Sequence, residues 1–124
     1  MKEVSNIVML QRIRNRIIEY LGAVSSYEKQ GEMGPTAIIC RWEDWVVESW
    51  NEDYVDPVFS KEEQDAIGKY NATWEQVADL TPDPPPALEE LVNTEAWKRL
   101  HDEAEKSLAV FHKRGKLSEE HEGI

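Results

Sequence analysis

The chain has 124 residues, and its 25 acidic and 14 basic side chains give a formal net charge of −11 at pH 7. Because phosphate groups repel a protein of this charge, we expect neither nucleic acid nor a membrane among its partners. The hydrophobic share of 40% can supply one core, so the length predicts one helical domain over residues 1–116 and a polar tail over residues 117–124.

The first predicted helix covers residues 5–24. At about 3.6 residues per turn, its apolar stripe consists of Leu10, Ile13, Ile17, Tyr20, Leu21 and Val24. Asn15 and Glu19 lie on the opposite, polar side. Arg14 lies near the edge of the stripe, where a cation most often pairs internally or runs along the apolar surface. Glycine and proline among polar side chains predict a loop over residues 25–35.

The second predicted helix covers residues 36–51, although its first residues alone would also fit a strand. The whole stretch favours a helix, because the helical period brings Trp42 and Trp45 onto one face, whereas a strand would separate them. Asp44, Glu48 and Glu52 then form an acidic ridge at the spacing i, i+4, i+8 on the other side.

The third predicted helix begins at a capping box and runs to about Leu80. In such a box the Ser60 hydroxyl accepts from the Glu63 N–H, and the Glu63 carboxylate accepts from the Ser60 N–H. The following residues 81–86 are rich in proline, which removes backbone donors and must interrupt the helix.

The last predicted helix covers residues 95–114, after a short helical turn over residues 88–92. Gly115 can take the left-handed conformation that ends such a helix. Amphipathic segments without a convincing strand predict an all-α fold, a bundle of three to four helices with a proline-rich break before the last one.

The negative charge is concentrated in the middle of the chain, because residues 31–92 carry −12 and the remainder carries +1. The candidate binding residues for a basic protein partner are Asp44, Glu48, Glu52, Asp53, Asp56 and Trp50. The alternative is a solvated acidic face without a partner. The pattern favours a non-enzymatic interaction module, such as an inhibitor, an immunity-type protein or a regulatory subunit.

A small-ligand pocket is the second hypothesis. Its candidate residues are Tyr20, Trp42, Trp45 and Trp74, with Arg14 as the polar anchor. The alternative is that these tryptophans anchor the core of the bundle. A third hypothesis is an enzyme without a recognisable motif, whose catalytic groups converge only in the fold. Wide apolar stripes also permit a homo-oligomer.

The sequence contains none of the common nucleotide-binding, hydrolase or zinc motifs, so we expect no catalytic residue, no metal and no cofactor. The apolar runs are much shorter than the roughly 18 residues that span a bilayer, and no secretory signal is visible. Cys40 is the only cysteine, which favours a reducing, cytoplasmic location.

Two fragments of the N-terminal part carry a resemblance to known proteins. They are Arg14-Asn-Arg-Ile-Ile-Glu-Tyr-Leu21, followed by Ser25 and Ser26, and Trp42-Glu-Asp-Trp-Val46. Together they resemble small conserved bacterial proteins of uncharacterised function. The resemblance implies a bacterial origin and a compact helical protein, and it assigns no functional residue.

Overall fold

The computed structural model describes residues 5–46, 52, 54–55, 58–82 and 85–122. Every regular element within these ranges is a helix, which confirms the predicted all-α class. The elements are α1 (Asn6–Val24), α2 (Tyr27–Met33), α3 (Pro35–Trp45), α5 (Lys61–Leu80), α6 (Leu88–Leu91) and α7 (Glu95–His112). No described helix has an apolar stretch long enough to cross a bilayer.

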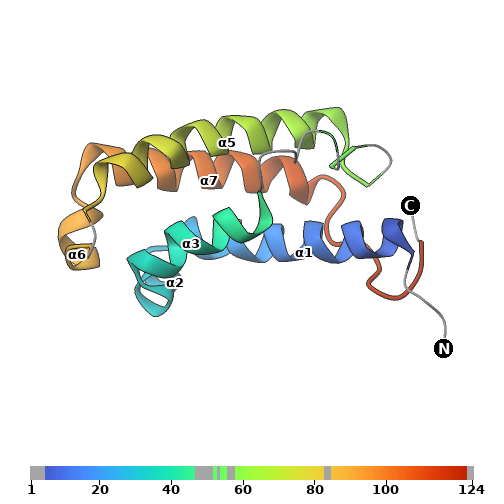
Figure 1. Cartoon of the computed structure of the whole chain (residues 1–124), viewed down its shortest axis with the longest axis horizontal. Helices are drawn as coiled ribbons and strands as arrows, with labels where there is room; N and C mark the ends of the chain where they lie inside the picture. The colour runs from blue at the N-terminus through green and yellow to red at the C-terminus, as the bar shows by residue number, and fades with distance from the viewer. Residues whose placement is uncertain (1–4, 47–51, 53, 56–57, 83–84, 123–124) are drawn as a thin grey trace.

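The long helices α1, α5 and α7 form the body of the bundle (Figure 1). Helix α7 packs against α5 and against α1 and runs opposite to both, while α2 and α3 lie against the C-terminal half of α1. The core includes Ile17, Leu21, Ile38, Trp42, Ile67, Tyr70, Leu100 and Phe111, each at most 1% exposed. Burial of each such side chain stabilises the fold by about 1.5–3 kcal/mol.

Local capping signals set several helix ends. The Ser5 hydroxyl accepts from the Val8 N–H at 3.2 Å, at the start of α1. The predicted capping box of α5 is confirmed, because the Ser60 hydroxyl accepts from the Glu63 N–H at 3.2 Å and the Glu63 carboxylate accepts from the Ser60 N–H at 3.1 Å. Gly115 follows α7 with a φ of 72°, as the predicted helix stop requires.

The prediction of a loop over residues 25–35 is wrong, because this stretch contains α2. The Ser26 hydroxyl caps it by accepting from the Lys29 N–H at 3.4 Å. Gln30 is buried, and its side-chain amide donates to the Val24 carbonyl. A local cap and one buried contact with α1 therefore outweigh the helix-breaking effect of the glycines.

Helix α3 ends at Trp45, earlier than the predicted end near residue 51. Val46 is extended, with φ −113° and ψ 98°, and its side chain packs into the core. The Tyr54 hydroxyl donates to the Trp45 carbonyl, which satisfies a carbonyl group that the helix end leaves free. A contact from a residue outside the helix thus helps to end it.

The C-terminal tail is docked on α1 over residues 117–122, which we call the tail strap. The Asn15 amide oxygen accepts from the Leu117 N–H at 2.9 Å, and its nitrogen donates to the Leu117 carbonyl at 2.8 Å. Asn15 lies on the polar side of α1 as expected, but the tail strap buries it to 1% exposure.

Candidate functional site

The predicted acidic surface is partly described by the structure. Asp44 is exposed on α3, and Glu52 is exposed in the segment between α3 and α5. Because α3 ends at Trp45, a continuous helical ridge from Asp44 to Glu52 does not form, and that part of the prediction is wrong. Glu48, Trp50, Asp53 and Asp56 lie outside the described residues.

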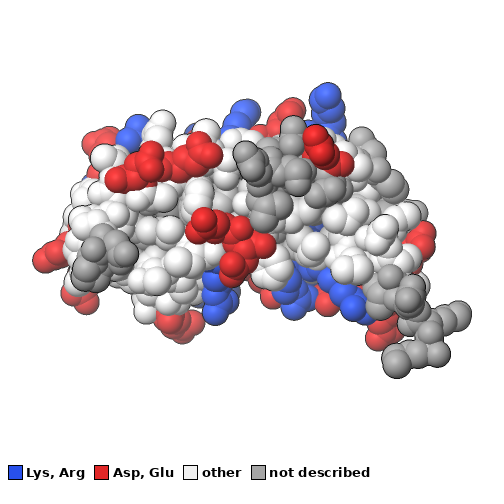
Figure 2. Space-filling model, viewed as in Figure 1, with Lys and Arg blue, Asp and Glu red and all other residues white. Residues whose placement is uncertain are grey.

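Among the described acidic side chains of residues 31–92, Glu63 is buried and the others face solvent. The described cations of the same range are Arg41, Lys61 and Lys69. Figure 2 shows acidic side chains over α3 and α5 on the face toward the viewer, and basic side chains below them over α1. The charge imbalance therefore reaches solvent, where it can attract a basic partner.

A hollow of about 510 Å³ lies between the N-terminal half of α1 and the acidic segment after α3. We call it the Met9 hollow, and it is lined by Asn6, Met9, Leu10, Ile13, Glu52 and Tyr54. Met9 is 50% exposed, while Leu10 and Ile13 pack with one side against the core. The hollow thus joins an apolar floor to the carboxylate of Glu52.

Tyr54 is held against the core beside the Met9 hollow. Its ring stacks on Phe59 at a centroid distance of 4.7 Å and an angle of 13°, and its hydroxyl bonds Trp45. Tyr54 itself is only 6% exposed. Tyr54 therefore gives the Met9 hollow one wall that is held by contacts with the core.

Arg14 belongs to a buried ion network between α1, α5 and α7. Its guanidinium donates to the Glu63 carboxylate at 2.8 and 3.1 Å, with both side chains at most 2% exposed. Arg14 also donates to the Gly115 carbonyl at 2.5 Å, and Arg114 donates to the same carboxylate at 2.6 and 3.1 Å. The internal pairing that the sequence favoured for Arg14 is confirmed.

The protonation of Glu63 depends on these arginines. Burial by itself would raise the pKa of the Glu63 carboxyl, but the hydrogen bonds from Arg14 and Arg114 outweigh it and hold this pKa below its usual value. Glu63 is therefore ionised at neutral pH and compensates the buried charge of Arg14.

An aromatic cluster fills the core between α1, α3 and α5. The ring of Trp42 lies 5.5 Å from Tyr20 and 4.5 Å from Tyr70 between centroids. The Tyr20 hydroxyl donates to the Ile38 carbonyl at 2.6 Å and lies 2.8 Å from the Tyr70 hydroxyl. Burial raises the pKa of Tyr20 and of Tyr70 above the usual range, so both hydroxyls stay neutral.

The structure brings the residues of the predicted ligand pocket together only in part. Tyr20 and Trp42 meet in the core, and Trp74 donates from its indole N–H to the Ile39 carbonyl at 3.0 Å. Tyr20 and Trp45 line a hollow of about 160 Å³ whose other walls are Arg16, Glu19, Ala23, Met33 and Arg41. Arg14 is not among them, and a ligand that used it would have to replace Glu63.

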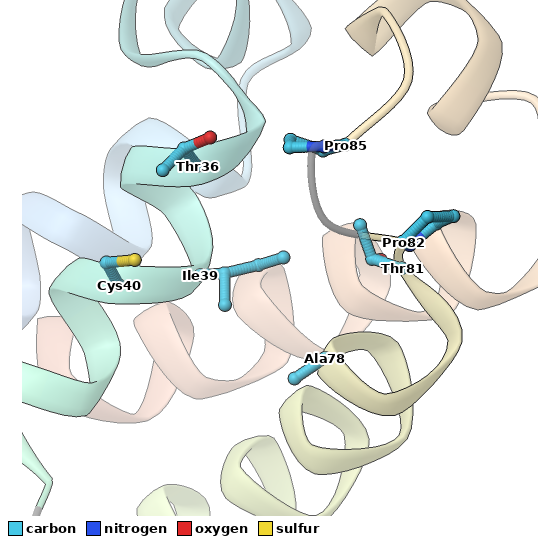
Figure 3. A pocket seen from close by; sticks show the side chains of 7 residues that line it. All are labelled: Thr36, Ile39, Cys40, Ala78, Thr81, Pro82 and Pro85. Atoms are coloured by element: carbon cyan, nitrogen blue, oxygen red, sulfur yellow. The ribbon is translucent and has the colours of Figure 1, made fainter.

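Cys40 lies in a separate hollow of about 240 Å³ between α3 and the end of α5 (Figure 3). The other lining residues are Thr36, Ile39, Ala78, Thr81, Pro82 and Pro85. None of these described lining residues is a general base that would activate the thiol.

His101 has acidic neighbours on α7. Its ring nitrogens lie 3.4 Å from Asp102 and 3.3 Å from Glu105, and Tyr27 stacks on the ring at 4.3 Å between centroids. In the described part of the chain, no group of three or more His, Cys, Asp or Glu side chains is arranged to hold a metal ion.

Sequence reasoning missed the apolar half of the site. Met9 lies off the main stripe of α1, and Tyr54 stands between acidic residues outside any predicted helix. Each could have been noticed as a large apolar or aromatic side chain in a polar setting. Their meeting depends on the path of the chain after α3, which no local pattern encodes.

The chain has no counterpart among the proteins it was compared with. No model of a known protein family matches it, and neither does a curated protein or a solved structure. The resemblance of the N-terminal fragments to small bacterial proteins stays a prediction, and a function for the chain must be argued from its surface.

Proposed function

We propose that this chain is a non-enzymatic protein–protein interaction module that binds a basic segment of a partner protein at the Met9 hollow. The observation that carries the proposal is a hollow of about 510 Å³ that is lined by Met9, Leu10 and Ile13 of α1 together with Glu52. The exposed carboxylates of residues 31–92 support it, because they extend the negative potential around the hollow.

The apolar side chains of the Met9 hollow and the carboxylates around it would contribute to binding in different ways. An apolar side chain of the partner gains affinity by leaving water against Met9, Leu10 and Ile13, and methionine adapts its shape to such a guest. Carboxylates at the border speed the approach of lysine and arginine and discriminate against acidic proteins. The fitting partner segment therefore carries an apolar anchor flanked by basic residues.

An inhibitor, an immunity-type protein or a regulatory subunit would act in this way, by covering a basic surface of its target. A bacterial, cytoplasmic setting fits the proposal. Cys40 is an exposed free thiol, and such a thiol persists best in a reducing compartment.

Affinity capture with three immobilised full-length baits tests the proposal. The baits are the unmodified chain, the site variant Asp44→Lys/Glu52→Lys, and the control variant Glu89→Lys/Glu90→Lys. The control makes the same change of net charge at other exposed carboxylates, on α6. We expect the unmodified and control baits to capture the same partner in similar amounts. The site variant should capture at least tenfold less of it.

The captured partner is then measured in solution. Its association with the unmodified chain should slow as salt is raised, and Met9→Asp should weaken binding because it places a charge on the apolar floor. Equal capture by all three baits, or binding that Met9→Asp leaves unchanged, would reject the Met9 hollow as the site.

A further inference from the structure

Side chains of α1 hold the tail strap mainly through its backbone carbonyl and N–H groups. Gln11 donates from its side-chain amide to the carbonyls of Ser118 at 2.7 Å and His121 at 2.9 Å. Arg12 donates to the Glu119 carbonyl at 2.7 Å, and Asn15 pairs with both backbone groups of Leu117. Contacts of this kind are how binding surfaces hold non-helical peptides.

The tail strap also places an acidic side chain beside the Asn15 amide and the Arg16 guanidinium. The Glu119 carboxylate accepts from the Asn15 amide at 3.1 Å and forms an ion pair with Arg16. The hydrogen bond from Asn15 and the positive charge of Arg16 lower the pKa of Glu119. The face of α1 under the tail strap is therefore suited to a carboxylate.

The tail strap has little apolar anchorage of its own. Leu117 is its only residue that packs against the described core, while Glu120, His121 and Glu122 are exposed. The Arg16 and Glu119 side chains remain 38% and 42% exposed, so water and salt weaken their attraction. Undocking the tail strap would cost much less than unfolding the bundle.

We infer that the face formed by Gln11, Arg12, Asn15 and Arg16, the tail-strap face, is a binding site for an acidic, non-helical peptide segment of a partner protein, which the tail strap occupies in cis. The charges fit this partner, because the first 30 residues carry a net charge of +2 in a chain of −11. The tail-strap face lies roughly 140° around α1 from the Met9 hollow, so the two sites are separate.

The test is a titration of the full-length chain with a fluorescein-labelled peptide of the sequence of residues 115–122, followed by anisotropy. The released variant Leu117→Asp/Glu119→Lys weakens the cis occupant and leaves every residue of α1 unchanged. We expect the peptide to bind it at least tenfold more tightly than the unmodified chain, because the cis competitor is gone. A peptide with lysine in place of the Glu119 equivalent should not bind.

Matched variants test whether the peptide binds at the tail-strap face. Glu120→Lys makes the same charge change as Glu119→Lys at the neighbouring exposed position, and it should behave as the unmodified chain. Asn15→Leu in the released variant should remove peptide binding. If circular dichroism shows that the released variant does not fold, the variant Glu119→Gln replaces it. We then expect the affinity for the labelled peptide to be at least threefold higher than that of the unmodified chain.

Two results would overturn the inference. One is a folded released variant that binds the peptide no more tightly than the unmodified chain, or binds it equally after Asn15→Leu. The other is a dimer of the unmodified chain, growing with concentration and lost in Glu119→Lys, which would assign the tail-strap face to exchange of tails between two copies.

Discussion

Arg14 and Arg16 stand two residues apart on α1, and each pairs with a carboxylate from a distant part of the chain. Arg14 meets Glu63 at the junction of α1, α5 and α7, where neither side chain is more than 2% exposed. Arg16 meets Glu119 in the tail strap, where both are more than a third exposed. The same type of ion pair, between an arginine and a glutamate, is therefore buried at one position of α1 and exposed to solvent at the other.

The difference in burial decides what each pair can do. Removing one partner of a buried pair leaves an uncompensated charge, which makes the junction a condition for folding. An exposed pair contributes little net stability, so it can open and close without unfolding the protein. The part of α1 at Arg14 is thus required for folding. The part at Arg16 can release the tail strap and bind another segment in its place.

Glu63→Gln should produce the largest effect, because it leaves Arg14 buried without a compensating charge. We expect a loss of about 3–5 kcal/mol in the free energy of unfolding, measured by urea denaturation at pH 7. The control is Glu62→Gln, since Glu62 is exposed and pairs with Lys113 at 2.8 Å. Its expected loss is at most about 1 kcal/mol. Similar losses in both variants would contradict a special role of the junction.

The pH dependence of stability should follow from Glu63. Its pKa is lowered in the fold, so the unfolded chain binds the proton more tightly. This contribution is fully present above the unfolded pKa of about 4.3 and is lost as the pH falls toward the folded pKa. Urea denaturation from pH 7 to pH 3 should show a steeper decline for the unmodified chain than for Glu63→Gln. Parallel declines would assign the acid sensitivity to other carboxylates.

The sequence predicts the parts of the fold that local patterns encode, and the capping box at Ser60 is the clearest example. The end of α3 at Trp45 was beyond it, because the Tyr54 hydroxyl reaches the Trp45 carbonyl only in the folded chain. The pairing of Arg14 with Glu63 spans 49 positions, and that of Asn15 with Leu117 spans 102. Helical periodicity shows which face a side chain occupies, but not which distant segment covers that face.

Asn15→Leu should have an intermediate effect, because it removes the paired hydrogen bonds to Leu117 in a nearly buried setting. We expect a loss of about 1–2 kcal/mol in the free energy of unfolding. Asn93→Leu is the control, since Asn93 is exposed and its side chain bonds the nearby Glu89 carbonyl at 2.9 Å. That control should stay within about 0.5 kcal/mol of the unmodified chain. Equal losses would mean that the tail strap contributes nothing through Asn15.

Added salt should give the smallest effect and separate the two arginine pairs directly. At about 1 M salt the screening length falls to roughly 3 Å, which weakens attraction between exposed charges and leaves buried pairs almost unchanged. In NMR spectra, the side-chain amide signals of Asn15 should therefore shift with salt, because the tail strap spends more time undocked. The Nε–H signal of Arg14 should stay in place, because its partner Glu63 is shielded from the solvent. Equal shifts of both signals would show that the junction and the tail strap open together, and that α1 does not divide into a fixed and an exchangeable region.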